Sequence, residues 1–450
     1  MEAKPPVTIH SLPEELVLDI FSYFANPAPD NRLHDQPSSE ILRNTEGACP
    51  LKTISLVQRR WRAIALPLLF RCAVWVLDQF DQTLIEAGDN ANAIKKIPIL
   101  EFLRSTGLGH DVRSFTMIIN DTMPSCTDTK MTVPSQSSWR DPDTTDTVPH
   151  RRNSTLFHNK DKNWLWEMLF SLTDPLKFTI IASPQTLARL LSCAVFVEDA
   201  EFYSHVERLH ILSLSRHFPS EVAKSPQRGQ LYFNLARHCG EEYVQTALFT
   251  IRPWTHMLLN ENSSIRVYRN YHFFEHEPPS ILPSLLGCGA RPYHVPLIPP
   301  SITSLSYVAI FPTERIIRKL ECALPRLDHL FVQLIPRNDI LLDPDETSHV
   351  DIRDLWITST VCYNFFLGRL LRNEGLVDMA EPSDHNTSID PQDQNANSTP
   401  GYNWRFLKEF ESGDASSEDA WTDVMQYLNK SVSAWRIKKE GLLVRGAVPS

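Results

Sequence analysis

The segment SITSLSYVAIFPTERIIRKLECALPRLDHLFVQL, residues 301–334, holds the pattern on which the fold prediction rests. Residues 302–307 and 327–332 share one spacing of apolar residues, apolar-x-x-Leu-x-apolar, and the two units start 25 residues apart. Between them, residues 313–324 carry Ile316, Ile317 and Leu320 at helical spacing, with Thr313 in position to cap the helix. The segment therefore predicts a strand, a helix that packs behind it, and a second strand.

The same six-residue unit recurs elsewhere in the chain. A third copy covers residues 352–357, another 25 residues further on, while an earlier copy covers 206–211 and a looser one 112–117. Units of this kind at intervals of about 20 to 29 residues resemble leucine-rich repeats, in which each unit adds one strand to a concave sheet. The Asn or Cys of the usual repeat is missing here, so a different α/β fold with extra helices stays open as the alternative.

Two further segments extend the pattern. Residues 178–182 are β-rich and are followed by Ser183 as an N-cap and Pro184 at the first helical position, which predicts a strand that leads into a helix. Near the C-terminus, an apolar stripe at helical spacing follows an acidic start and predicts a helix that caps the array; it comprises Trp421, Val424, Met425, Leu428, Val432 and Trp435.

The N-terminal region shows a different pattern. In SLPEELVLDI, residues 11–20, Ser11 and Glu14 fit a capping box, and the apolar residues then recur every four positions. A second amphipathic segment, LKTISLVQRRWRAIALPLLFR at residues 51–71, carries a basic face, and Pro67 is expected to end its helix. Two or three short helices bury little surface among themselves, so this apolar surface needs either the rest of the chain or a partner.

The order of these residues closely resembles the F-box, especially its fungal form. The resemblance covers about 60 residues, from Leu-Pro at 12–13 through Leu-Val at 56–57 and Arg-Trp at 60–61 to Pro-Leu-Leu-Phe-Arg at 67–71. It implies a three-helix module that docks on the small acidic Skp-type adaptor of an SCF-type cullin-RING ubiquitin ligase. The residues it places in the contact or its support are Leu12, Pro13, Leu16, Ile20, Val57 and Trp61. The polar connection at residues 25–50 is longer than the family's usual one, although loop length itself costs little free energy.

Together these patterns predict an α+β molecule of several units. We expect a three-helix F-box at 8–75, a linking segment at 76–119, an irregular leucine-rich-repeat-like α/β solenoid at 161–379, and C-terminal capping helices and a tail at 403–450. Residues 120–160 and 380–402 are rich in Ser, Thr, Asp, Asn and Pro, and we expect them to be disordered insertions.

Composition limits the functions that the chain can have. The 450 residues carry a formal net charge of −10, which argues against general nucleic-acid binding. No stretch reaches the roughly 20 apolar residues of a membrane span, and the N-terminus lacks a secretory signal pattern. We therefore expect a cytoplasmic or nuclear protein whose 8 cysteines are packed thiols.

The sequence lacks recognisable catalytic motifs. It contains no dinucleotide fingerprint, no Walker-type phosphate loop and no nucleophile elbow. The best metal candidate, His272-Phe-Phe-Glu275-His276, lacks further ligands nearby, and satisfied histidines are the simpler interpretation. We expect neither a metal nor a cofactor, and no catalytic activity.

The leading hypothesis is therefore a substrate-recognition subunit of an SCF-type ligase, which holds the adaptor and, through it, the cullin, and binds an unknown protein substrate on the repeat-like region. One alternative is an adaptor-bound F-box scaffold outside an active ligase, and another is an enzyme with an unrecognised site. For the substrate, we expect contacts on the strand faces of the aligned units, among them Phe331, Arg353 and Trp356.

Overall fold

The structure is a computed structural model. It describes residues 9–25, 33–34, 49–77, 97–120, 163–195, 209–217, 246–261, 279–288, 295–310, 312, 314–336, 339–342, 344–348, 351–372, 402–414 and 434–446. Most of the two insertions expected at 120–160 and 380–402 lies outside these residues, as does the metal candidate at 272–276.

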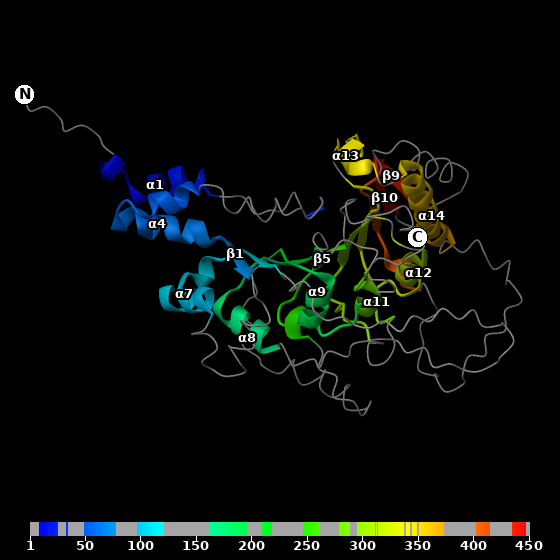
Figure 1. The fold of residues 1–450 in the computed structure, drawn as a ribbon, viewed down its shortest axis with the longest axis horizontal. Helices are drawn as coiled ribbons and strands as arrows, with labels where there is room; N and C mark the ends of the chain where they lie inside the picture. Colours follow the sequence, from blue (N-terminus) through cyan, green and yellow to red (C-terminus); the bar gives the residue numbers. More distant parts are fainter. Residues whose placement is uncertain are drawn as a thin grey trace, which may run out of the picture.

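A ten-stranded mixed sheet forms the centre of the molecule, and its first eight strands follow one another in chain order (Figure 1). A hairpin completes the far edge, where β10 lies between β8 and β9. The strands are β1 (Cys72–Leu77), β2 (Ser114–Ile119), β3 (Lys177–Ala182), β4 (His210–Ser215), β5 (His256–Glu261), β6 (Ser304–Ala309), β7 (His329–Gln333), β8 (Glu409–Ser412), β9 (Trp435–Lys439) and β10 (Leu442–Arg445).

Strand direction changes near the middle of the sheet and again at its end. β1, β2 and β3 are parallel, as are β5, β6, β7 and β8. β4 runs antiparallel to both of its neighbours, and the β10 hairpin is antiparallel to β8. The sheet is therefore mixed, with two parallel blocks joined through β4.

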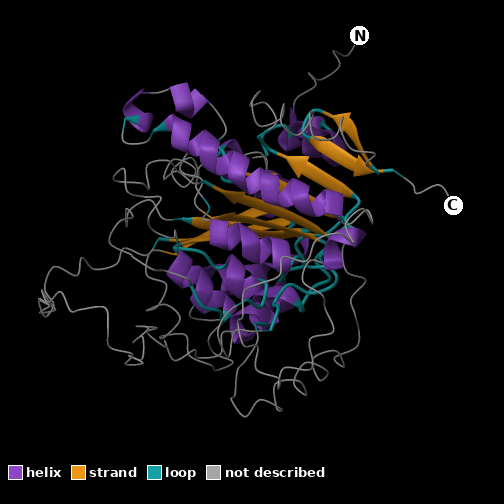
Figure 2. Cartoon of the chain, turned by 90° about the vertical axis from the view of Figure 1, so that its right-hand side faces the viewer, coloured by secondary structure: helices purple, strands orange, loops and turns teal. Residues whose placement is uncertain are grey.

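Helices cover one face of this sheet and connect its strands (Figure 2). The core between them takes alternate residues from the strands, such as Phe115, Phe178, Leu305 and Leu330, because successive side chains of a strand point to opposite faces. The helices that pack there are α7 (Pro98–Thr106), α8 (Asn163–Leu172), α9 (Pro184–Leu191), α11 (Leu282–Leu285), α12 (Glu314–Cys322) and α14 (Ile352–Arg372). A four-residue helix, α13 (Pro344–Thr347), precedes α14.

Several predicted elements are confirmed. β6, α12 and β7 form the strand, helix and strand expected from residues 301–334, and Ile316, Ile317 and Leu320 are buried. β3 leads into α9, where the Ser183 side chain accepts a hydrogen bond from the backbone N–H of Thr186 at 3.2 Å. Residues 112–117 overlap β2, and residues 210–211 of the fourth unit lie in β4.

Two predictions in the C-terminal part are wrong. Residues 352–357 do not form a strand, because they begin the 21-residue helix α14. Apolar residues continue at helical spacing through Cys362, Phe366 and Leu370, all buried against the sheet, and this longer pattern decides the conformation. Trp435 is not helical either: it starts strand β9, and its ring packs in the main core. The other residues of the predicted capping stripe lie within 415–433, outside the described residues.

The N-terminal helices form a small unit with a core of their own. They are α1 (Glu14–Ser22), α3 (Pro50–Ile54) and α4 (Arg59–Phe70), and α1 follows a short 3-10 turn, Ile9–Ser11. Val17, Phe21 and Leu51 pack there against Ile64 and Ala65. In Figure 1 this unit projects from the β1 end of the sheet.

Two local predictions in this unit are corrected. Ser11 does not cap α1, since Pro13 occupies the N-cap position and makes no side-chain cap hydrogen bond. Pro67 does not end α4, which continues to Phe70. The carbonyl that Pro67 would leave without a donor belongs to Ala63, an exposed residue, so water can satisfy it.

Among the residues that the structure describes, no helix has the length and apolarity that a bilayer crossing requires.

Candidate interaction surfaces

Exposed apolar side chains concentrate on the N-terminal helical unit. Of the fourteen large apolar residues that are exposed in the described part of the chain, eight belong to it: Ile9, Leu16, Leu18, Ile20, Tyr23, Phe24, Leu56 and Val57. α1 explains the pattern, because its apolar residues cover more of the helix than one neighbour can bury. Val17 and Phe21 turn inward, which leaves Leu16 and Ile20 outside the core.

The six predicted adaptor-binding residues fall into two groups. Leu16, Ile20 and Val57 are exposed, with 48%, 38% and 58% of their surface accessible, and Pro13 is exposed as well. Leu12 and Trp61 are half-buried and pack against the unit's own core. The first group is therefore available to a partner, while the second supports it from beneath.

Specific contacts hold this unit together and fix it to the sheet. The Trp61 ring meets Phe21 edge-on, with centroids 5.7 Å apart, and Nη2 of Arg60 donates to the carbonyl of Leu12 at 2.6 Å. On the other side of α4, Phe70 stacks on Phe102 of α7 at 5.1 Å and joins the main core. Because α4 belongs to both cores and leads directly into β1, the apolar surface of α1 has a stiff connection to the sheet.

The face of the sheet away from the helices forms a second candidate surface, here called the second face. A small apolar cluster lies on it, in which Leu33 packs against Ile118 of β2, Ile181 of β3 and Ile211 of β4. Leu33 comes from the long connection between α1 and α3, yet only 2% of its surface is exposed. In Figure 1 the short blue segment near β5, on the side opposite α9, is residues 33–34.

Two buried amides hold the backbone of this segment. Nδ2 of Asn260 donates to the carbonyl of Leu33 at 2.9 Å, and Nε2 of Gln333 donates to the carbonyl of His34 at 3.1 Å. Both amides belong to one row across β5, β6 and β7, because Asn260 pairs with Val308 and Val308 with Gln333. The His34 ring also meets Phe331 edge-on, at 5.0 Å.

A polar row runs along one end of the same face. Oγ of Ser304 lies 3.0 Å from Nδ1 of His329, and Nε2 of His329 lies 3.4 Å from Oε2 of Glu411. The hydrogen bond from His329, and Lys439 at 2.9 Å, lower the pKa of Glu411 to about 2 despite its partial burial. Further along, burial and then the neighbouring His217 and His329 lower the pKa of His256. His256 is therefore neutral at pH 7, and the row carries a fixed negative charge at Glu411.

Of the predicted substrate-contact residues, the structure places one on the second face. Phe331 lies there in β7, where it contacts His34. Arg353 and Trp356 belong to α14, a helix that packs on the other face, so the prediction that they share a strand surface with Phe331 is wrong. The cause is the same misassigned unit at 352–357.

Sequence reasoning missed Leu33, His34, Asn260 and Gln333. Leu33 is a lone apolar residue within polar sequence, and a single leucine carries no periodicity. The two amides were detectable in principle, because Asn and Gln are unusual at positions that continue apolar strands.

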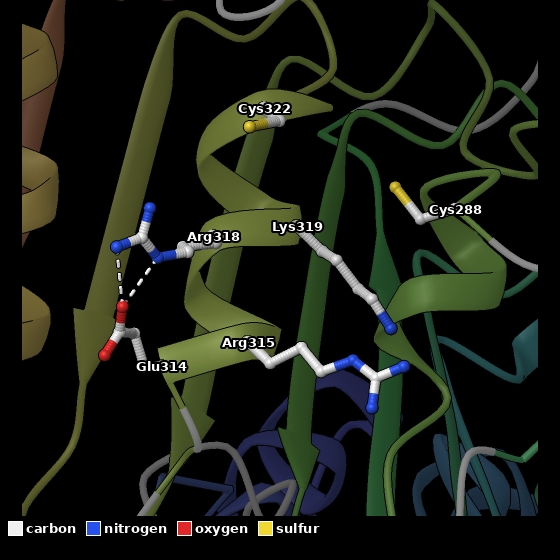
Figure 3. A pocket seen from close by; sticks show the side chains of 6 residues that line it. All are labelled: Cys288, Glu314, Arg315, Arg318, Lys319 and Cys322. Atoms are coloured by element: carbon white, nitrogen blue, oxygen red, sulfur yellow. Dashed lines mark hydrogen bonds and ion pairs between the residues drawn. The ribbon is translucent and has the colours of Figure 1, made fainter. Parts of the chain in front are cut away.

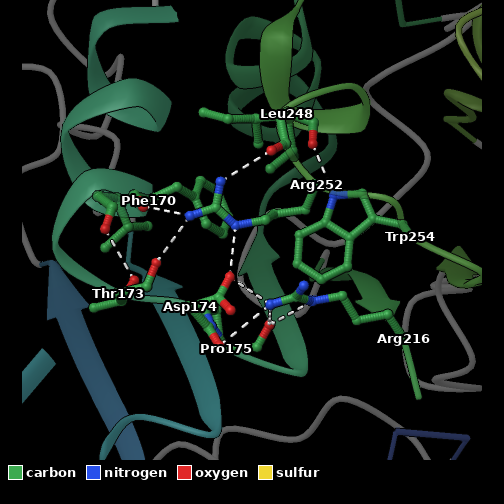
Figure 4. Close-up of polar contacts among 10 residues, drawn as sticks. Phe170, Thr173, Asp174, Pro175, Arg216, Leu248, Arg252 and Trp254 are labelled. Carbon is green, nitrogen blue, oxygen red and sulfur yellow. Dashed lines mark hydrogen bonds and ion pairs between the residues drawn. The ribbon is translucent and has the colours of Figure 1, made fainter. Parts of the chain in front are cut away.

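Two arginines fasten the loops at which strand direction changes. Arg216, at the end of β4, and Arg252, before β5, both pair with Asp174, at 2.5 Å and 2.7 Å (Figure 4). Arg216 also donates to the Pro175 carbonyl and lies over the Trp254 ring. Since only 2% of the Arg216 side chain is exposed, this cluster fixes the antiparallel strand β4 and is structural.

On the helix side, α12 borders a shallow hollow of about 500 Å³ (Figure 3). Arg318 pairs with Glu314 at 2.6 Å and lies over the Phe365 ring, and Lys319 and Cys288 both line the hollow. Burial raises the pKa of the Cys288 thiol in spite of the nearby lysine, so the thiolate needed for nucleophilic chemistry is disfavoured.

Glu261 is the buried acid with the clearest pKa shift. Burial raises its pKa to about 7, although its carboxylate accepts hydrogen bonds from Ser280 Oγ at 2.7 Å and from the backbone N–H of Ile281 at 2.6 Å. The Leu282 N–H and the Tyr307 hydroxyl contribute two more, at 3.0 Å and 3.2 Å. A carboxylate that is surrounded in this way ties the start of α11 to β5 and β6, which is a structural role.

Comparison with known proteins gives no relative: no family model, no curated protein and no solved structure matches the chain. Within the described ranges, no group of three or more His, Cys, Asp and Glu residues is placed to hold a metal ion.

Proposed function

We propose that this chain is a substrate-recognition subunit of an SCF-type cullin-RING ubiquitin ligase. The N-terminal helical unit is an F-box that binds a Skp-type adaptor, and the sheet with its helices is the part that binds a protein substrate. The chain itself catalyses no reaction. It brings a substrate's lysines near a ubiquitin-loaded enzyme, where a tether raises local concentration to the millimolar range.

The observation that carries this proposal is the exposed apolar surface of the N-terminal unit. Leu16, Ile20 and Val57 lie outside every core that the described residues form, and their partial exposure forgoes a share of the roughly 1.5 to 3 kcal/mol that full burial of each side chain would contribute. Apolar residues that gather on one element mark a protein interface more often than scattered ones do. Their positions agree with the F-box pattern of the sequence.

The charge of α3 and α4 favours an acidic partner, although α1 itself carries Glu14, Glu15 and Asp19. Arg59 and Arg62 of α4 are exposed, and neither α3 nor the first turn of α4 contains an acidic residue. An adaptor with acidic side chains around an apolar groove would match this surface, since complementary charge increases the association rate and the specificity.

The fold supports the receptor role in a second way. Strands that follow one another in chain order are typical of a repeat array, and the proposed leucine-rich-repeat-like solenoid accounts for this order from β1 to β8. A regular array would have parallel strands throughout, whereas β4 is antiparallel to both of its neighbours. The proposed solenoid is therefore an irregular one. Such a stiff body would hold the adaptor interface and the substrate interface at a fixed separation. Ubiquitin transfer that depends on proximity requires such a fixed separation.

The test is co-purification of adaptor and cullin with a tagged full-length chain that carries Leu16→Ser and Ile20→Ser. Both side chains are exposed, so the fold is expected to persist, while the loss of two apolar contacts is expected to weaken adaptor binding at least 30-fold, or about 2 kcal/mol.

The control is Ile357→Ser on α14, which removes an apolar side chain that is even more exposed, at 62%, and lies far from the N-terminal unit in sequence. The control should retain the adaptor. Undiminished adaptor recovery with the double variant, or an equal loss with the control, would refute the proposed interface.

A further inference from the structure

The contacts around Leu33 and His34 have the composition of a peptide-binding site. The apolar residues Ile118, Ile181 and Ile211 receive one leucine side chain, and Phe331 receives one ring. We call these four residues, with Asn260 and Gln333, the Leu33 socket.

The side-chain amides of Asn260 and Gln333 donate to the main-chain carbonyls of Leu33 and His34, and Nε2 of Gln333 also donates to the carbonyl of Ile335 at 3.1 Å. Any peptide can offer such carbonyls, so the amides supply affinity for a backbone and the apolar residues supply selectivity for a leucine. This division is the usual one where proteins bind short peptides.

Burial raises the free-energy cost of leaving the polar groups of the Leu33 socket without hydrogen bonds. Asn260 and Gln333 are both fully buried, where a lost hydrogen bond is costly, and the carbonyls of residues 33–34 accept one hydrogen bond from each amide. Oε1 of Gln333 has no hydrogen-bond partner among the described residues, which leaves an acceptor that residues 33–34 do not use. An incoming peptide N–H could occupy it.

The neighbouring strand is adapted to the same site. A Cβ on Gly413 would lie 2.6 Å from Cζ of Phe331 and 2.9 Å from Cβ of Gln333, so only glycine lets these two side chains take their positions. The hydrogen bond from the Gly413 N–H to the Val332 carbonyl, 2.7 Å, keeps that backbone close.

We propose that the second face of the sheet is a docking site for a short peptide that carries leucine followed by histidine or an aromatic residue, and that Leu33–His34 occupies it in cis until such a peptide on another protein displaces it. The identity of that protein as a ubiquitination substrate rests on the function proposed above, whereas peptide binding itself does not. The connection between α1 and α3 is then a competitor for the receptor site.

The competition between residues 33–34 and an added peptide can be estimated from the effective concentration of the tethered segment. A segment of the same chain acts at an effective concentration on the order of 1 mM, so a peptide of the same sequence added in solution binds the wild type only weakly. Replacing Leu33 and His34 removes the competitor and leaves the socket open.

The experiment measures fluorescence anisotropy of a labelled peptide with the sequence of residues 29–38, PDNRLHDQPS, titrated with the full-length chain in the absence of adaptor. The variant Leu33→Ser with His34→Ser should bind it at least 10-fold more tightly than the wild type. Adding Gln333→Leu to that variant should abolish the gain, and a probe with serine in place of its leucine should not bind.

Equal affinity of wild type and double variant, or no binding by a double variant that retains a cooperative melting transition, would overturn the proposal. If the double variant does not fold, the wild type decides by hydrogen exchange with excess unlabelled peptide. Faster exchange at residues 33–34 supports displacement, and unchanged exchange overturns it. Because no adaptor is present, a chain that binds adaptor but not peptide fails this proposal alone, and a chain that binds peptide but not adaptor fails the proposed function alone.

Discussion

Glu261 illustrates how a single buried carboxyl group connects local packing to the behaviour of the molecule. Four donors surround its oxygens, yet burial dominates and raises its pKa from 4.5 to about 7. Between these two values the folded state keeps a proton that the unfolded state has lost. The free energy of unfolding that depends on this group therefore decreases as pH rises from about 4.5 to about 7.

The variant Glu261→Gln should remove this dependence, since the amide is uncharged and its oxygen can still accept from the N–H groups of Ile281 and Leu282. Urea unfolding at pH 5 and at pH 8 measures it. We expect the wild type to lose about 2.5 kcal/mol more than the variant over this range. A variant with the same decline as the wild type would contradict the assignment.

Single residues also show where sequence reasoning succeeds. Ser183 was predictable as an N-cap because the signal is local: a strand ends, serine follows, and proline occupies the first helical position. Ser11 shows the limit of the same rule, since a 3-10 turn ends at it and the helix begins three residues later. The sequence allows the helix to start after Ser11 or after Pro13, and only the backbone geometry shows which of the two is the N-cap.

At the level of elements, the arginine cluster explains how the sheet accommodates β4. Asp174 follows α8 and receives Arg216 from the end of β4 and Arg252 from before β5, so one carboxylate connects three segments. The desolvated Arg216 makes this carboxylate necessary, because a buried guanidinium without its counter-charge is costly.

The variant Asp174→Ala should therefore lower the free energy of unfolding by about 3 kcal/mol. The control Glu314→Ala removes a carboxylate from an arginine pair of similar length, but the side chains of Glu314 and Arg318 are 52% and 58% exposed. Solvent screens such a pair, and we expect the control to lose less than about 0.5 kcal/mol. Thermal and urea unfolding of both variants measure the difference, and similar losses would mean that the cluster at Asp174 contributes no more than a surface pair.

Three units with the same apolar spacing show how far periodicity alone predicts secondary structure. The units at 302–307 and 327–332 form strands, whereas the unit at 352–357 has the same spacing and is helical. A unit of six residues fits both the strand period and the helix period. After 352–357, buried apolar residues continue at helical spacing as far as Leu370, and this longer pattern favours a helix. The pattern therefore predicts the strand position of Phe331 correctly and that of Arg353 and Trp356 wrongly.

At the level of the whole molecule, contacts between distant segments were beyond the sequence patterns. Leu33 is 227 positions from Asn260, and His34 is 299 positions from Gln333, yet they are hydrogen-bonded. A prediction of these contacts requires the sheet order and its register, which place Asn260 and Gln333 in one row. The exposed apolar surface of α1, in contrast, was foreseeable, because a short amphipathic unit has more apolar surface than it can bury.

The chain thus has two surfaces of opposite character at this scale. The apolar residues of the N-terminal unit are open, and the socket on the second face is filled by residues 33–34. The connection between α1 and α3 joins them in sequence. An adaptor on the N-terminal unit and a peptide in the Leu33 socket would therefore bind at sites that the connection between α1 and α3 links in sequence.

The most direct test of the proposed adaptor interface is calorimetric titration of the purified full-length chain with a purified Skp-type adaptor. We predict one-to-one binding with a micromolar or lower Kd and a negative heat-capacity change, as burial of Leu16, Ile20 and Val57 requires. Absence of binding by a folded wild-type chain, or binding with no heat-capacity change, would contradict the account.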